Sequence, residues 1–182
     1  HGFWRKWRKL VKSLNPEAYT TAEIVTLAPD YLRGDEFDAV MNYEWLYAVM
    51  GFFTLHPGAL SSADFRRRLE RIRRAYPHEI AFGLQNLLDS HDVGRVLTMI
   101  ENRFPPFERF AEYFECSRVK DRPTLATTRP GQAARQTLRQ VAVFQVVYVG
   151  APMIYYGTEV GLWGANDPCD RQPMLWADVE HA

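Results

Sequence analysis

The sequence is poor in cysteine, in net charge and in long apolar runs, and each shortage excludes a class of protein. Its 182 residues include two cysteines, Cys116 and Cys169, which lie far apart and outside any CxxC pattern. Two such cysteines form neither a disulfide framework nor a cysteine-based metal knuckle. They favour a reducing compartment, so the cytoplasm is the expected location.

The charge balance and the hydropathy exclude two kinds of partner. Lys and Arg together number 22, and so do Asp and Glu, so the formal net charge is zero. A chain without net charge has no overall field that attracts nucleic acid or an anionic membrane. No apolar run approaches the roughly 20 residues that span a bilayer. We therefore expect neither nucleic acid nor a membrane as a partner.

The composition is that of a folded domain in which helices and strands alternate. Hydrophobic residues make up 47% of the chain and charged residues 24%, which is typical of a globular protein. Apolar residues at helical spacing predict helices over residues 3–14, 45–53, 62–76, 93–100 and 132–148. Short apolar or β-branched runs predict strands over residues 18–25, 37–42, 81–88 and 152–156. Residues 105–123 are expected to be irregular.

This alternation predicts an α/β fold with a parallel sheet and right-handed crossovers. Four strands cannot close a parallel barrel, which needs about eight. The fold is therefore either a small open sheet or half of a barrel.

The most informative stretch is Asp-Ser-His-Asp at residues 89–92, directly after the predicted strand at 81–88. Core packing gives no reason for an imidazole between carboxylates where a buried strand ends. In parallel α/β proteins the loops at this end of the strands converge and bind ligands. Polar residues follow the other predicted strands too, at Glu23, Asn42 and 155–159. The pattern indicates a functional site at one edge of the sheet.

Five segments in order resemble motifs of the α-amylase family of glycoside hydrolases, and most closely its neopullulanase and cyclomaltodextrinase branch. They are TAEIV at 21–25, FDAVMNY at 37–43, LLDSHD at 87–92, GAPMIYYGTEVG at 150–161 and DPCDRQPMLW at 167–176. The resemblance covers essentially the whole chain. It implies a single fragment, residues 1–182, that forms part of a (β/α)8 TIM barrel: strands five to eight with their helices.

The resemblance also implies roles for seven side chains and a substrate. Glu23 would be the general acid and Asp92 would stabilise the transition state of a retaining hydrolase, whose chemistry needs paired carboxylates. Substrate contacts would come from His91, Tyr43, Tyr156, Asp167 and Arg171. The partner would be an α-glucan with α-1,4 bonds, such as maltodextrin, cyclodextrin or pullulan. No cofactor or metal is expected here, and any calcium would belong to the full-length parent.

One departure from the family pattern limits what the fragment is expected to do. The nucleophilic Asp of the family lies in a Gly-x-Arg-x-Asp motif, and residues 1–182 contain no such motif. Because the helix that follows this motif resembles residues 2–14, we expect the nucleophile immediately before His1. The fragment alone should then be inactive. Its open barrel edges should drive self-association into a homo-oligomer.

Each candidate residue also has an interpretation without catalysis. Glu23 could be an ordinary exposed carboxylate, Asp92 could cap a helix that begins at Val93, and Asp167 could simply form an ion pair with Arg171. Two other functions stay open at this point. One is a non-catalytic half-barrel that binds α-glucan, and the other is an unrelated α/β domain in which the Ser-His-Asp stretch is accidental.

Overall fold

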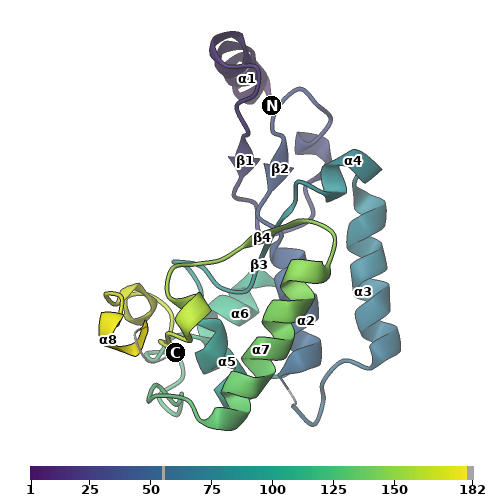
Figure 1. Ribbon diagram of the computed structural model, residues 1–182. Coiled ribbons are helices and arrows are strands. Elements are labelled where there is room, and N and C mark those ends of the chain that lie inside the picture. Colours follow the sequence, from purple (N-terminus) through teal and green to yellow (C-terminus); the bar gives the residue numbers. More distant parts are fainter. Residues whose placement is uncertain (55, 180–182) are drawn as a thin grey trace.

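The computed structural model describes residues 1–54 and 56–179 (Figure 1). The strands are β1 (Thr21–Ala22), β2 (Ala39–Val40), β3 (Gln85–Leu87) and β4 (Ala151–Met153). The α-helices are α1 (Gly2–Leu14), α2 (Tyr43–Phe53), α3 (Ser62–Ala75), α4 (His78–Ala81), α5 (Val96–Asn102), α6 (Phe110–Cys116), α7 (Gln132–Val147) and α8 (Trp176–Val179). Short 3-10 turns are η1 (Pro29–Tyr31), η2 (Thr158–Val160) and η3 (Cys169–Arg171).

The strands are parallel, as their alternation with helices predicted. β1 pairs with β2, and β3 pairs with β4. Met41 joins the two pairs through a parallel bridge to Gln85, and the Asn42 amide donates to the Gln85 carbonyl oxygen over 2.8 Å. The strands therefore lie in the order β1, β2, β3, β4, and their carboxyl ends share one edge.

Each strand is shorter than the sequence predicted. The run at 81–88 was expected to be extended throughout, but Ala81 ends helix α4 and only Gln85–Leu87 pairs. That prediction is wrong because a short apolar run does not distinguish a strand from a buried helical turn. Strand β4 likewise ends at Met153, so the residues that were predicted to extend it to 156 lie outside the sheet.

The segment predicted to be irregular, 105–123, contains helix α6. Its Tyr113 is fully buried and packs edge-on against Phe107, with the ring centroids 4.9 Å apart. A helix this short is held by tertiary packing rather than by propensity. The five longer predicted helices are all present, although α5 begins three residues later than expected.

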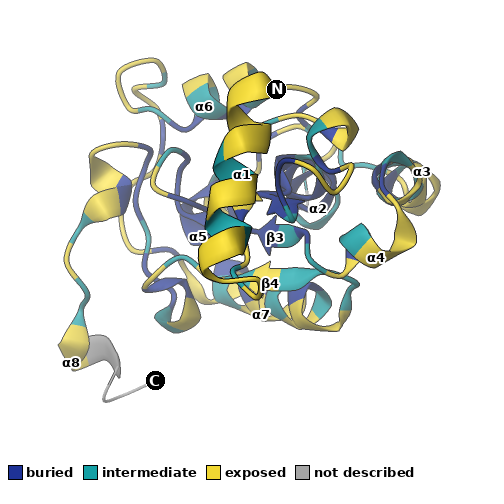
Figure 2. Cartoon of the chain, turned by 90° about the horizontal axis from the view of Figure 1, so that it is seen from above, coloured by how far each residue is buried: buried dark blue, intermediate teal, exposed yellow. Residues whose placement is uncertain are grey.

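Helix α2 is the centre of the core. Its first turn is capped by Asn42, whose side chain accepts a hydrogen bond from the Trp45 amide over 3.3 Å. Nearly every side chain from Tyr43 to Met50 is buried, because α2 packs against β3, α3, α5 and α7 (Figure 2). Helix α3 covers its outer side, and its cap is Ser61, one residue before the expected start.

Apolar side chains are exposed at both outer ends of the strand order. Helix α1 buries no residue and is coloured mostly as exposed in Figure 2. Its Leu14 is 80% exposed. A hollow of about 440 Å³ lies between α1 and β1, lined by Trp4, Trp7, Phe37 and Glu23 among others. At the β4 end, α7 exposes three valines, Val143, Val146 and Val147. In the described part of the chain, no helix combines the length and apolar character needed to cross a membrane.

Candidate active site

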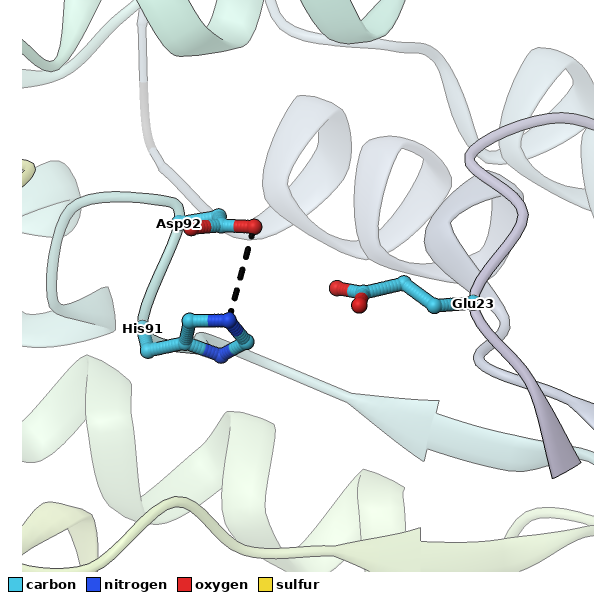
Figure 3. A group of neighbouring side chains, drawn as sticks. All are labelled: Glu23, His91 and Asp92. Atoms are coloured by element: carbon cyan, nitrogen blue, oxygen red, sulfur yellow. Dashed lines mark ion pairs between the residues drawn. The ribbon is translucent and has the colours of Figure 1, made fainter.

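Three of the predicted site residues meet at the carboxyl edge of the strands (Figure 3). Glu23 directly follows β1, while His91 and Asp92 lie in the loop after β3. One oxygen of each carboxylate and one ring nitrogen of His91 all lie within 4.8 Å of one another. The Glu23 carboxylate points toward the other two groups, and His91 Nε2 is 3.5 Å from Asp92 Oδ2. Glu23 and His91, which are 68 positions apart in the chain, thus face each other.

The buried residue Tyr43 contacts this group. Its hydroxyl group donates to Glu23 Oε1 over 3.2 Å and also lies 3.2 Å from Ser90 Oγ. Ser90 Oγ in turn accepts from the Asp92 amide over 3.2 Å. Burial raises the pKa of Tyr43, and the nearby Glu23 carboxylate adds to the rise while the Ser90 hydrogen bond opposes it. The phenol therefore stays protonated and can donate to the carboxylate.

Arg171, in the loop that contains η3, also contacts the site. Its Nε donates to the His91 carbonyl oxygen over 3.1 Å and lies 2.9 Å from Asp167 Oδ1. One Nη lies 3.4 Å from Asp92 Oδ1. The loop ion pair between Asp167 and Arg171 is therefore present, and the same guanidinium also reaches Asp92. All three groups are about half exposed, so the pairs orient side chains more than they stabilise the fold.

The carboxylate that accepts a hydrogen bond from the start of α5 belongs to Asp89 rather than Asp92. Helix α5 begins at Val96, and the Val96 amide donates to Asp89 Oδ2 over 3.0 Å. The interpretation of Asp92 as a cap for a helix from Val93 is therefore wrong, and the Asp92 carboxylate is free to face the site. Burial raises the pKa of Asp89 to about 6, against the effect of the Val96 hydrogen bond. Thr158 also donates to both Asp89 oxygens, over 2.8 and 2.9 Å.

Tyr156 lies beyond β4, and its described contacts are with other residues than Glu23, His91 and Asp92. Its hydroxyl group donates to the Gln172 carbonyl oxygen over 2.7 Å. Its ring stacks on the guanidinium of Arg95, with Cζ 4.6 Å from the ring centroid. Tyr156 is 42% exposed.

Two buried charged residues close to the site were missed from the sequence, Arg95 and Asp170. Both are fully buried, and Arg95 Nε donates to the Asp170 carbonyl oxygen over 2.9 Å. Burial raises the pKa of Asp170 to about 6, and Arg171 and Arg95 oppose that rise. The one available signal was the position of Arg95, three residues after Asp92 and ahead of an apolar helix.

The donors of Glu23, His91 and Asp92 are of the types that bind a divalent metal ion. However, Arg171 already places a positive charge on Asp92, and this lowers the attraction for a cation. The arrangement suits proton transfer and hydroxyl recognition better than metal binding.

The family model for the catalytic domain of α-amylase matches residues 1–182. The chain belongs to the α-amylase family. Its curated relatives in this family include neopullulanase 2 of Thermoactinomyces vulgaris, 40% identical over 180 residues, which are 99% of this chain and 25% of that protein. A cyclomaltodextrinase from Bacillus sp is 34% identical over 181 residues, 100% of this chain and 26% of that protein. The chain thus spans about a quarter of the length of these relatives.

Solved structures of α-amylase-family enzymes share the fold. Cyclic α-maltosyl-(1→6)-maltose hydrolase from Arthrobacter globiformis, in complex with cyclic α-maltosyl-(1→6)-maltose, matches with a TM-score of 0.72 and 31% identity. The match covers 98% of this chain and 33% of that one. A cyclomaltodextrinase structure matches with a TM-score of 0.74 and 32% identity over 99% of this chain and 25% of that one. The predicted family is confirmed, and the chain is an α/β fragment of the amylase catalytic domain.

Proposed function

We propose that this chain carries the general acid and the transition-state stabiliser of a retaining hydrolase that cleaves α-1,4 bonds in maltodextrin, cyclodextrin or pullulan. The observation that carries the proposal is the approach of Glu23 to His91 and Asp92, with one donor atom of each within 4.8 Å of the others. In this proposal β1 to β4 are strands five to eight of the barrel.

The side chains suit the two halves of such a reaction. Glu23, oriented by the Tyr43 hydroxyl group, would protonate the leaving glycosidic oxygen. Asp92 would accept hydrogen bonds from sugar hydroxyls that strengthen as the ring gains oxocarbenium character. His91 would donate to the same sugar, and the Arg171 guanidinium, 3.4 Å from Asp92 Oδ1, helps to orient Asp92. Asp167 and Tyr156 would contact other sugar units of the same glucan.

Retention also requires a nucleophilic carboxylate about 5–5.5 Å from the acid. The Gly-x-Arg-x-Asp motif that would carry it is not among residues 1–182. The 182-residue chain on its own should therefore bind α-glucan without cleaving it.

The names of the relatives support an α-glucan as the substrate class. The similar proteins include a neopullulanase and cyclomaltodextrinases, and the Arthrobacter globiformis hydrolase was also solved in complex with maltose. These names describe those proteins, and the substrate of this chain is our proposal.

Calorimetry with maltoheptaose on the purified chain tests the proposal. We expect binding, and Asp92→Asn should weaken it about tenfold or more, because a hydrogen bond to a charged group contributes about 1.5–3 kcal/mol. Asp64→Asn, on the outer helix α3, is the matched control and should bind like the unmodified chain. Absence of binding at millimolar sugar would contradict the proposal. A reducing-sugar assay on the same samples should detect no turnover, and substantial turnover would refute the expected inactivity. Binding without turnover is also expected of a non-catalytic α-glucan-binding half-barrel, so hydrolysis by the whole protein separates the two candidates. In the whole protein that contains this chain, Glu23→Gln should abolish cleavage if Glu23 is the general acid, and an unchanged rate would contradict that role.

A further inference from the structure

Arg95 lies at the junction of three segments around the candidate site, and its side chain is fully buried. It immediately precedes α5 and lies three residues after Asp92. Its guanidinium stacks on two rings, with Cζ 4.1 Å from the centroid of Tyr155 and 4.6 Å from that of Tyr156. A desolvated guanidinium in contact with two tyrosine rings gains a substantial cation–π attraction.

The same side chain fastens the loop after β4 to the loop that carries η3. Nε donates to the Asp170 carbonyl oxygen over 2.9 Å, and one Nη donates to the Tyr156 carbonyl oxygen and approaches Thr158 Oγ1. The Arg95 amide donates to the Gly164 carbonyl oxygen over 3.0 Å. The planar fork of an arginine can serve several fixed acceptors at once, which a lysine cannot do.

We propose that Arg95 is a positioning residue that holds Arg171 against His91 and Asp92. The link is short, because Arg95 binds the backbone of Asp170 and the next residue is Arg171. Arg171 then contacts the His91 carbonyl oxygen and the Asp92 carboxylate. The consequence for glucan binding rests on the proposed function, whereas the placement of Arg171 does not.

The link runs through the Asp170 backbone and not through an ion pair. Among the described residues neither Asp170 carboxylate oxygen has a hydrogen-bond partner, and one Nη of Arg95 has none. A role limited to charge neutralisation would be kept by Arg95→Lys. Backbone positioning would be largely lost in Arg95→Lys, because one ammonium cannot reach the acceptors of both loops.

The first readout is the Nε–H signal of Arg171 in ¹H–¹⁵N NMR spectra of the full chain, assigned by its loss in Arg171→Lys. In the unmodified chain this hydrogen is bonded to the His91 carbonyl oxygen, and Asp167 Oδ1 also lies 2.9 Å from the nitrogen, so it should exchange slowly with water. In Arg95→Met and Arg95→Lys, the Arg171 Nε–H should lose that hydrogen bond and exchange about tenfold faster. A tenfold change corresponds to about 1.4 kcal/mol. The matched control is Arg122→Lys, whose native guanidinium stacks on Phe104 at 4.3 Å, and it should leave the signal unchanged.

The second readout is maltoheptaose affinity in a double-mutant cycle of Arg95→Met and Arg171→Ala. If Arg95 acts through Arg171, the double variant should lose about as much affinity as either single variant, since coupled residues are not additive. Independent, multiplying losses would overturn the proposal, as would an unchanged Arg171 signal in a folded Arg95 variant. If Arg95→Met does not fold, Arg95→Lys replaces it in both measurements. If the unmodified chain binds no glucan, the proposed function fails while the NMR signal still decides the role of Arg95.

Discussion

The hydroxyl group of Tyr43 reaches the Glu23 carboxylate from the buried side of the site, where its ring is 1% exposed. Because burial keeps the phenol protonated, it acts as a fixed donor that restricts the orientation of Glu23. This is a feature of one side chain, and it can be removed without disturbing the packing of the ring.

We expect Tyr43→Phe to lower the free energy of unfolding by about 0.5–1.5 kcal/mol, the net contribution of a typical hydrogen bond. Urea unfolding of the purified chain measures this. In the whole protein that contains this chain, the same change should lower kcat about tenfold, because Glu23 would lose its orientation. A loss of stability without any change in kcat would show that the contact is structural alone.

The buried carboxyl groups of Asp89 and Asp170 predict a pH dependence of stability. Burial raises both folded-state pKa values to about 6, above the ordinary 3.8, so the folded state binds these protons more tightly than the unfolded state. The stability that each proton contributes is therefore present below pH 4 and is lost as the pH rises through 6. Each unit of difference corresponds to about 1.4 kcal/mol.

Urea titrations between pH 4 and pH 7 should show this fall, and Asp170→Asn should flatten it, because an uncharged amide has no proton to lose. Asp89→Asn should remove the other contribution while its oxygen still accepts from the Val96 amide. An unchanged slope in both variants would contradict the assignment.

At the residue scale, sequence predicted more of the site than of its support. Glu23, His91 and Asp92 stand out because charged groups follow apolar strands, and the structure brings them together. The burial of Arg95 and Asp170 could not be predicted, because a charge becomes buried only when distant loops pack over it. The distinction between Asp89 and Asp92 as the cap of α5 depended on where the helix begins.

At the element scale, Asn42 has two roles at the start of α2. Its side-chain oxygen caps the helix at the Trp45 amide, and its Nδ2 donates to Asn86 Oδ1 over 2.9 Å in the core. The cap fixes where α2 begins, and the second bond ties α2 to β3. Because Tyr43 is the first residue of the helix, the cap also fixes the position from which its hydroxyl group reaches Glu23.

We expect Asn42→Ala to lower the free energy of unfolding by about 2–3 kcal/mol, because a lost cap costs about 1 kcal/mol and a buried group left without its partner costs a similar amount or more. Chemical denaturation measures it. Ser61→Ala is the matched control, since Ser61 caps α3 at an exposed position and should cost only about 1 kcal/mol. Equal losses in the two variants would contradict a structural role for the Asn86 bond.

Element types were predictable where the periodicity was long. The stripes on α1, α3 and α7 gave correct helices, because repeated apolar spacing leaves little choice. The strands were found but overextended, since only two or three residues of each form ladder pairs. Helix α6 was missed because two prolines and scattered charges conceal the residues that tertiary packing buries.

At the scale of the whole molecule, the exposed apolar side chains at the two ends of the strand order predict self-association. Residues of α1 and β1 line one shared hollow, and α7 lies against β4 with Val147 74% exposed. Light scattering at high micromolar concentration should show a dimer or a larger species, because patches of this kind rarely stay exposed in soluble monomers. Val146→Lys on α7 should reduce the association, whereas Lys9→Glu on the polar face of α1 should not. A clean monomer would contradict the prediction.

The family followed from five ordered motifs and the α/β class from the alternation of helices and strands, and both are confirmed. The parallel pairing followed from the alternation of elements. The sequence could not show how the loops after β3 and β4 close over Arg95, because that closure involves residues 75 positions apart.

Among the described residues, β1 pairs with β2 alone and β4 with β3 alone, so an assembly of copies through the strand edges would use the outer sides of β1 and β4. These two sides differ, so a contact that joins β1 of one copy to β4 of the next is head-to-tail. Two copies with a suitable rotation would close such a contact into a ring of eight parallel strands, the number at which side chains fill a barrel. With a different rotation the same contact would not close, and each added copy would present a fresh edge to the next. The rotation between neighbouring copies at the β1–β4 contact would therefore decide whether a finite particle or a growing fibre forms.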